Sequence, residues 1–302
     1  MKLDILSEYD KKIIKSFEYD YVAVSYVSGP GDIDKVRTLT NAGIIAKIEN
    51  KKGVENFDRI LEKSDGIMIA RGDLGTEIKP EKIPLIQKQI IKKCNQAGKL
   101  VITATQMLES MIHNPSPTRA ETSDIANAIL DGSDAIMLSG ETAIGKYPVK
   151  SVNVMSKVAR EIEPFVQSNV MIQKNSTISE AISKSVYEIT KVLPITKIIT
   201  MTRSGYTARI ISRFRLDTPI YAITPYEKVK RQLELFYGVQ SVVMKDMTRE
   251  KIIPCTKFLF RKKLITKKDL LLFTAGVFAI KSRSTNMIEV HRASDLLNQK
   301  SY

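Results

Sequence analysis

The sequence contains few of the residues on which thiolate or histidine sites depend. Only two cysteines and two histidines occur among its 302 residues. Cys94 and Cys255 lie far apart, which argues against a disulfide framework or a cysteine metal knuckle and favours a reducing, cytoplasmic location. His113 and His291 are isolated, and neither has a partner at metal-ligand or catalytic-triad spacing.

Long apolar runs are also absent. No stretch approaches the ~18 apolar residues of a membrane span, and the start MKLDILSEYDKK lacks the apolar core of a secretory signal. The composition, 43% hydrophobic and 26% charged, is that of a globular protein. The length allows two ordinary domains, each with a substantial core.

Acidic residues are scarce in one half only. Residues 1–165 hold 23 basic and 23 acidic side chains, whereas residues 166–302 hold 24 basic and 10 acidic ones, so the net charge of +14 lies in the second half. Three interpretations stay open: nucleic-acid binding, a site for a small phosphorylated ligand, and a solvated lysine-rich surface. Nucleic acid is the weakest, because the second half lacks interleaved aromatics and any binding motif.

The first half repeats an alternation of apolar β-branched runs and helix-like segments. Near-continuous apolar strands that alternate with helices indicate βαβ units and a parallel sheet buried on both faces. We expect strands at residues 21–27, 43–50, 65–73, 100–107 and 134–142.

Several of these strands end in polar or reactive residues. In a βα-barrel the functional residues come from the C-terminal ends of different strands, so a succession of such endings predicts a site. The endings are Lys47 and Glu49; Arg71 and Asp73; Thr103, Thr105 and Gln106; and Ser139 and Glu141.

Two of these endings favour a metal. Lys47 and Glu49 are two apart on a strand and point to the same face, and Asp73 comes from the next strand. Two converging carboxylates suit Mg²⁺ (or Mn²⁺), while the lysine can stabilise an enolate or a transferring phosphoryl group. The alternative is a Lys–Glu ion pair at a barrel rim, with Asp73 capping a helix.

Three long segments resemble pyruvate kinase. They are AKIENKKGVENFDRILEKSDGIMIARGDLGTEI, ITATQMLESMIHNPSPTRAETSDIANAILDGSDAIMLSGETAIGKYP and TNMIEVH, and the similarity extends from about Leu6 to Val290. It implies an α/β fold, with a partial TIM-type βα-barrel over residues 1–165 and a smaller C-terminal α/β domain over residues 166–302. It also implies phosphoryl transfer from phosphoenolpyruvate to ADP, giving pyruvate and ATP, in a cytoplasmic homo-oligomer.

The resemblance assigns roles to the strand endings. Lys47 matches the lysine that stabilises charge during phosphoryl transfer, and Glu49 and Asp73 match the metal ligands. The remaining assignments are a substrate-carboxylate pocket made by the backbone of Arg71, Gly72 and Asp73 with Thr105, and proton delivery to the enolate by Ser139 and Glu141.

The segment before residue 28 resembles the stretch that enters the fourth barrel strand. We therefore expect strands four to eight only, without the lid domain, the K⁺ ligands and the phosphoryl-gripping arginine. Either a second polypeptide supplies the front of the barrel, or the chain is a truncated product, or the strands have rearranged. The alternative function is that of a catalytically incompetent remnant that binds a ligand or a partner subunit.

In the second half, the segment KIITMTRSGYTARIISRF predicts a strand, a Ser/Thr/Gly loop and a helix, an arrangement suited to phosphate. By resemblance the loop binds a sugar-phosphate effector, and the stretch around Lys281 and Arg283 adds contacts. The alternative is an ordinary strand-to-helix turn. The loop residues are Thr202, Arg203, Ser204, Gly205, Tyr206 and Thr207.

Overall fold

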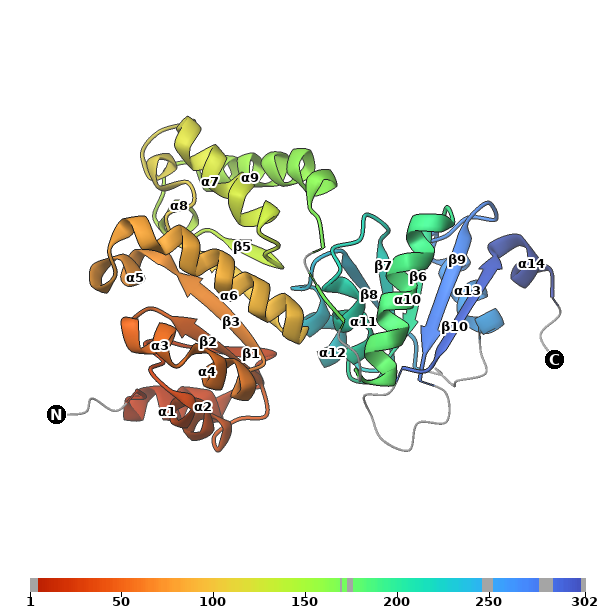
Figure 1. The fold of residues 1–302 in the computed structure, drawn as a ribbon, viewed down its shortest axis with the longest axis horizontal. Coiled ribbons are helices and arrows are strands. Elements are labelled where there is room, and N and C mark those ends of the chain that lie inside the picture. Colours follow the sequence, from red (N-terminus) through yellow and green to blue (C-terminus); the bar gives the residue numbers. More distant parts are fainter. Residues whose placement is uncertain (1–4, 169, 173–175, 246–251, 277–284, 300–302) are drawn as a thin grey trace. The chain divides into compact units, whose positions relative to one another are not determined.

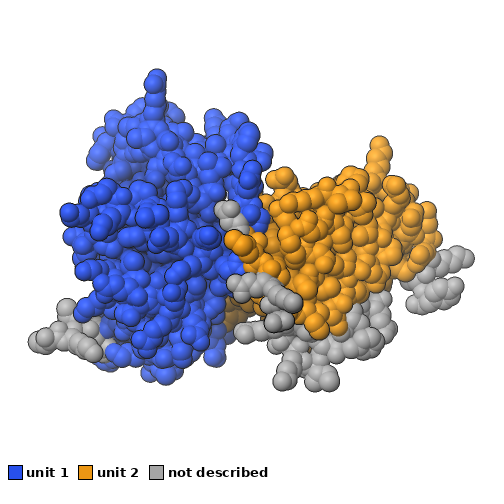
Figure 2. Space-filling view, viewed as in Figure 1, with its two compact units in different colours: residues 1–169 blue, residues 170–302 orange. Residues whose placement is uncertain are grey.

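The chain divides into two compact units, Met1–Asn169 and Val170–Tyr302 (Figure 2). The computed structural model describes residues 5–168, 170–172, 176–245, 252–276 and 285–299. The predicted effector contacts at Lys281 and Arg283 lie outside the described residues. Within the described ranges, none of the helices has the length and apolar character needed to span a membrane.

Unit 1 is built on a parallel sheet in the order β1-β2-β3-β4-β5, with helices between successive strands (Figure 1). Its strands are β1 (Tyr21–Val24), β2 (Gly43–Ile48), β3 (Gly66–Ala70), β4 (Leu100–Ala104) and β5 (Ala135–Met137). Its helices are α1 (Glu8–Ser16), α2 (Pro30–Arg37), α3 (Lys51–Glu55), α4 (Phe57–Lys63), α5 (Arg71–Glu77), η1 (Pro80–Lys82), α6 (Ile83–Ala97), η2 (Glu109–Ile112), α7 (Arg119–Leu130), α8 (Gly140–Ala143), α9 (Pro148–Ile162) and η3 (Glu163–Phe165).

The predicted strands of unit 1 are confirmed in number and order within the described residues, but several predicted ranges extend beyond the observed strand ends. The run 65–73 ends as a strand at Ala70, and Arg71 already begins α5. The run 134–142 keeps only Ala135–Met137 in the sheet. The segments predicted to carry the site are therefore loops and first helical turns placed at the strand ends, as in other βα units.

The core of unit 1 lies where the helices cover the sheet. β3 and β4 are buried along their whole length, as near-continuous apolar strands predict. A large apolar cluster includes Ile33 of α2, Ile60 of α4 and Ile91 of α6, each at most 1% exposed. This packing fixes the strand register and therefore the positions at which the site residues emerge.

Unit 2 is a mixed α/β sheet in the order β10-β9-β6-β7-β8, in which β10 is antiparallel to β9 and the other pairs are parallel (Figure 1). The fold class expected from the sequence, a partial barrel followed by a smaller α/β domain, is confirmed. The elements of unit 2 are α10 (Ile178–Val192), β6 (Lys197–Met201), α11 (Tyr206–Ser212), β7 (Ile220–Thr224), α12 (Glu227–Leu233), β8 (Val239–Val243), α13 (Ile252–Arg261), β9 (Leu270–Ala275), β10 (Met287–Arg292) and α14 (Ala293–Asn298).

Candidate active site

The C-terminal ends of the parallel strands in unit 1 share one edge of the sheet. Parallel pairing places the exits of β2, β3, β4 and β5 side by side. Most of the residues predicted for this site lie at the ends of these strands or directly after them, and they form three groups along this edge.

The first group is a charged cluster after β2. Lys47 Nζ lies 2.6 Å from Glu49 Oε1, and the Glu49 side chain is only 1% exposed. Lys47 also donates to Ser25 Oγ at 3.0 Å. The other Glu49 oxygen, Oε2, accepts the backbone N–H of Tyr26 at 2.6 Å. A buried carboxylate is therefore held by one cation and one amide, as its burial requires.

Asp73 joins this cluster from the first turn of α5. The hydroxyl of Tyr26 lies 3.5 Å from Asp73 Oδ1, so a single tyrosine contacts both predicted metal ligands. The negative charge of Asp73, followed by partial burial and the charge of Glu49, raises the pKa of Tyr26. The phenol keeps its proton and can act only as a donor toward the acid pair.

The second group joins α5 to the end of β4. The backbone N–H of Gly72 donates to Thr105 Oγ1 at 2.9 Å, and this hydroxyl donates to the Ala104 carbonyl at 2.6 Å. Thr105 and Gln106 both have a left-handed backbone, with φ of 68° and 54°. For a β-branched residue this conformation is strained, and strain of this kind gathers at functional sites.

The Arg71 side chain turns away from the edge and into the protein. Its guanidinium lies 2.6 Å from Asp124 Oδ1 on α7 and donates to the Thr105 carbonyl at 2.8 Å. Its side chain is 9% exposed. Arg71 therefore holds the β4 loop in place, and only its backbone is available to a ligand at the start of α5.

The third group follows β5. Glu141 is 1% exposed, and its carboxylate accepts the backbone N–H of Leu108 at 2.9 Å and that of Ser139 at 2.7 Å. Ser139 is partly exposed at the same edge. Thr103, in contrast, is fully buried within β4, where its hydroxyl pairs with Ser133. It is not a residue of the edge.

Sequence reasoning missed Ser25 and Tyr26. They directly follow β1, whose polar ending was not among those predicted to form the site. The rule that identified the other strand endings, applied to β1, would have found both residues.

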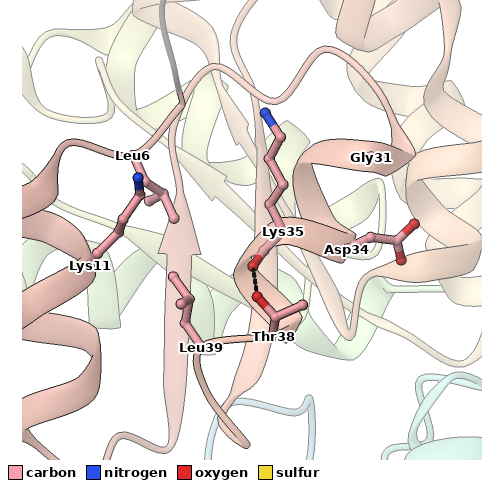
Figure 3. Close-up of a pocket in the computed structure, with 7 residues that line it drawn as sticks. All are labelled: Leu6, Lys11, Gly31, Asp34, Lys35, Thr38 and Leu39. Atoms are coloured by element: carbon pink, nitrogen blue, oxygen red, sulfur yellow. Dashed lines mark hydrogen bonds between the residues drawn. The ribbon is translucent and has the colours of Figure 1, made fainter.

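A separate hollow on unit 1 lies between α1 and α2 (Figure 3). It has a volume of about 510 Å³ and holds none of the predicted site residues. The charged ends of Lys11, Asp34 and Lys35 lie apart from one another in Figure 3, so they do not form a focus for a charged ligand. Its lining residues are Leu6, Lys11, Gly31, Asp34, Lys35, Thr38 and Leu39.

In unit 2, the predicted effector loop connects β6 to α11. The Gly205 N–H donates to Thr202 Oγ1 at 3.0 Å, and Gly205 has φ of 77°. The Thr207 hydroxyl pairs with that of Thr285 at 2.7 Å, and both Thr202 and Thr207 are at most 5% exposed. These two threonine hydroxyls shape the loop from within.

The outer side of the loop presents Arg203 and Ser204, which are exposed. Arg203 Nη2 donates to the Tyr226 hydroxyl at 2.8 Å, and this hydrogen bond raises the pKa of Arg203. Tyr206 is half-buried at the start of α11. The loop therefore offers one hydroxyl and one cation to solvent.

Comparison with known proteins assigns both units to one family. The family described as pyruvate kinase, barrel domain, matches residues 1–152, and the family described as pyruvate kinase, alpha/beta domain, matches residues 180–291. These two matches cover most of both units.

Individual relatives agree with this assignment. The chain is 45% identical over 291 residues to a pyruvate kinase of Geobacillus stearothermophilus, covering 92% of this chain and 50% of that protein. It is 45% identical over 287 residues to a pyruvate kinase of Clostridium acetobutylicum, covering 90% of this chain and 60% of that protein.

A solved structure is similar throughout. A pyruvate kinase from Cryptosporidium parvum superposes with a TM-score of 0.88 at 39% identity, covering 97% of this chain and 63% of that one. The chain thus spans between about half and two thirds of the length of these relatives. The resemblance seen in the three sequence segments is confirmed, and the chain belongs to the pyruvate kinase family.

Proposed function

We propose that this chain carries the metal-binding and enolate-stabilising part of a pyruvate kinase, which transfers a phosphoryl group from phosphoenolpyruvate to ADP in glycolysis. The observation that carries the proposal is the gathering of Lys47, Glu49 and Asp73 at one edge of the sheet, in a chain of this family. Pyruvate kinases generally use Mg²⁺ and K⁺ and generally form oligomers.

The residues at this edge fit Mg²⁺ by their chemistry. Glu49 and Asp73 supply hard oxygen donors from neighbouring strands, and Mg²⁺ is commonly held by one or two carboxylates, with water and substrate oxygens filling the other positions. Among the described residues, no group of three or more acidic, histidine or cysteine side chains gathers at one point. Bound there, Mg²⁺ would supply positive charge to the oxygens of the substrate.

Lys47 places an ammonium beside the same carboxylates. Its ion pair with Glu49 and its hydrogen bond to Ser25 fix the Nζ position before any substrate arrives. A preorganised cation of this kind stabilises the charge that develops on a transferring phosphoryl group and on the enolate oxygen. We assign no K⁺ ligand among the described residues.

The start of α5 would receive the substrate carboxylate. The first backbone N–H groups of a helix have no acceptor within the helix, and those of α5 are at Arg71, Gly72 and Asp73. The Gly72 N–H donates to the Thr105 hydroxyl, so both groups lie where the substrate carboxylate would bind in this proposal. A carboxylate oxygen that binds there competes with the Thr105 hydroxyl for the Gly72 N–H.

Of Ser139 and Glu141, the two residues proposed to deliver the proton, only Ser139 is exposed enough to reach solvent and the enolate. Glu141 is buried and holds the Ser139 backbone through a 2.7 Å hydrogen bond, so in this proposal it acts on the proton through Ser139. The remaining parts of the proposal are binding of ADP and ATP, a cytoplasmic location, and a phosphate-bearing effector at residues 202–207.

The decisive experiment separates two partial reactions. Exchange of the pyruvate methyl protons with solvent deuterium, followed by NMR with Mn²⁺ present, requires Lys47, the carboxylates and Thr105. Phosphorylation of ADP by phosphoenolpyruvate also requires the phosphoryl-binding parts of a whole barrel. We expect exchange by the 302-residue chain alone, and transfer once the barrel front of a close relative is added as a separate polypeptide.

The alternative is a chain that binds ligands but no longer catalyses either step. Metal binding without exchange, in a sample that has retained its fold by circular dichroism, would contradict the catalytic proposal and favour that alternative.

A further inference from the structure

Tyr26 has an unusual backbone for an exposed aromatic residue. Its φ is 52°, in the left-handed region, while 59% of its surface is exposed. A bulky residue in this region is strained and persists only where surrounding contacts fix it. Glycine or asparagine would adopt the same turn with less strain.

Both hydrogen bonds that Tyr26 donates lead to the acid pair, while its carbonyl accepts the Ser28 hydroxyl at 3.2 Å. Its N–H donates to Glu49 Oε2 at 2.6 Å, and its hydroxyl lies 3.5 Å from Asp73 Oδ1, at the long end of hydrogen bonding. Lys47 occupies the remaining Glu49 oxygen. Tyr26 thus spans the gap between two carboxylates, Glu49 directly after β2 and Asp73 in the first turn of α5.

We propose that Tyr26 is a positioning residue for the metal site, holding Glu49 through its amide and orienting Asp73 through its hydroxyl. This inference rests on the proposed function, because it takes Glu49 and Asp73 as the ligands. Each carboxylate oxygen has two lone pairs, so Glu49 can keep both donors and still coordinate an ion, while the hydroxyl on Asp73 Oδ1 leaves Oδ2 for the ion. Hydrogen-bond partners of metal ligands commonly set metal affinity by about 10- to 100-fold.

The test measures Mn²⁺ binding to the 302-residue chain by electron paramagnetic resonance. Tyr26→Phe removes only the hydroxyl, and we expect about tenfold weaker binding. Tyr26→Gly keeps the amide and relaxes the backbone, so a similar loss in both variants assigns the effect to the phenol and not to unfolding. Tyr9→Phe, at a 70% exposed tyrosine on α1, is the matched control and should bind as the parent does.

A spectroscopic signature provides a second readout. The sequence contains no tryptophan, so terbium luminescence excited through aromatic side chains must come from tyrosine. A Tb³⁺ ion held by Glu49 and Asp73 would be sensitised by Tyr26. We expect Tyr26→Phe to remove most of this emission and Tyr9→Phe to leave it unchanged.

The outcomes distinguish this inference from the function on which it rests. If Glu49→Gln and Asp73→Asn weaken Mn²⁺ binding while Tyr26→Phe does not, the positioning role is wrong and the metal site stands. If neither acidic variant changes binding, the metal site itself is wrong, and the role of Tyr26 is wrong with it. Loss of terbium emission with unchanged Mn²⁺ affinity would show proximity only and overturn the positioning role.

Discussion

Lys47 Nζ lies 2.6 Å from Glu49 Oε1, although Glu49 is almost completely buried. Removing one partner of a buried ion pair leaves an uncompensated charge, which typically costs about 3–5 kcal/mol. Lys47 therefore compensates the buried charge of Glu49 as well as placing a cation at the candidate site. Any test of Lys47 in catalysis must keep a positive charge next to Glu49.

Lys47→Arg keeps that charge but moves it, because the guanidinium is larger and planar. We expect the chain to stay folded and the exchange of pyruvate methyl protons to fall by about 10²–10³, the range for loss of one preorganised charge-stabilising group. NMR of deuterium incorporation measures the rate. Lys93→Arg, on the exposed face of α6, is the control and should exchange at the parent rate.

The effector loop can be tested at its exposed residues without disturbing its shape. Ser204→Ala and Arg203→Met remove the solvent-facing hydroxyl and cation, whereas Thr202 supports the loop through Gly205. Loss of a charge-assisted hydrogen bond should weaken phosphate binding by about tenfold or more. Calorimetry with fructose bisphosphate, glucose 6-phosphate, ribose 5-phosphate and inorganic phosphate measures it. Unchanged affinity in both variants would show that the loop is an ordinary turn.

Lys99 stabilises the C-terminal end of α4. Its ammonium donates to the carbonyls of Leu61, Glu62 and Ser64 at 2.6, 2.8 and 2.8 Å. Lys99→Met keeps the aliphatic stem and removes the charge, so we expect about 2–3 kcal/mol less stability in urea unfolding. Lys92→Met, at an exposed position of α6, should change stability by less than about 0.5 kcal/mol.

Glu121 links stability to pH. Burial alone would raise the pKa of Glu121, but hydrogen bonds from Ser110 and Thr118 outweigh it and hold this pKa below 4.5. Because the pKa of Glu121 is lower in the folded state than in the unfolded state, ionised Glu121 stabilises the fold above pH 4.5. This stabilisation is lost as the pH falls through the pKa of the folded state.

Glu121→Gln should therefore reduce the free energy of unfolding by about 1 kcal/mol near neutral pH, the usual size for a helix cap. The difference from the parent should shrink in acid, where Glu121 itself becomes protonated. Urea unfolding across the acid range measures it. A constant difference at every pH, or an equal effect of Glu109→Gln at an exposed position, would contradict the assignment.

Much of the fold could be read from local pattern. Apolar β-branched runs alternating with amphipathic segments predicted the parallel strands and their order, because strand and helix periodicities are visible over a few residues. The polar endings after β2 to β5 predicted a site at one edge of the sheet, and the structure brings most of these residues close together there. Both predictions follow from near neighbours in the chain.

The arrangement within the site depended on the tertiary structure. Arg71 turns inward to Asp124, which is 53 residues away, and Tyr26 joins Glu49 to Asp73 across 23 and 47 residues. No local propensity predicts left-handed backbone at a tyrosine, because that conformation is unfavourable until distant contacts stabilise it. Strand positions were thus set by hydrophobic pattern, whereas side-chain directions were set by the packing of separate βα units.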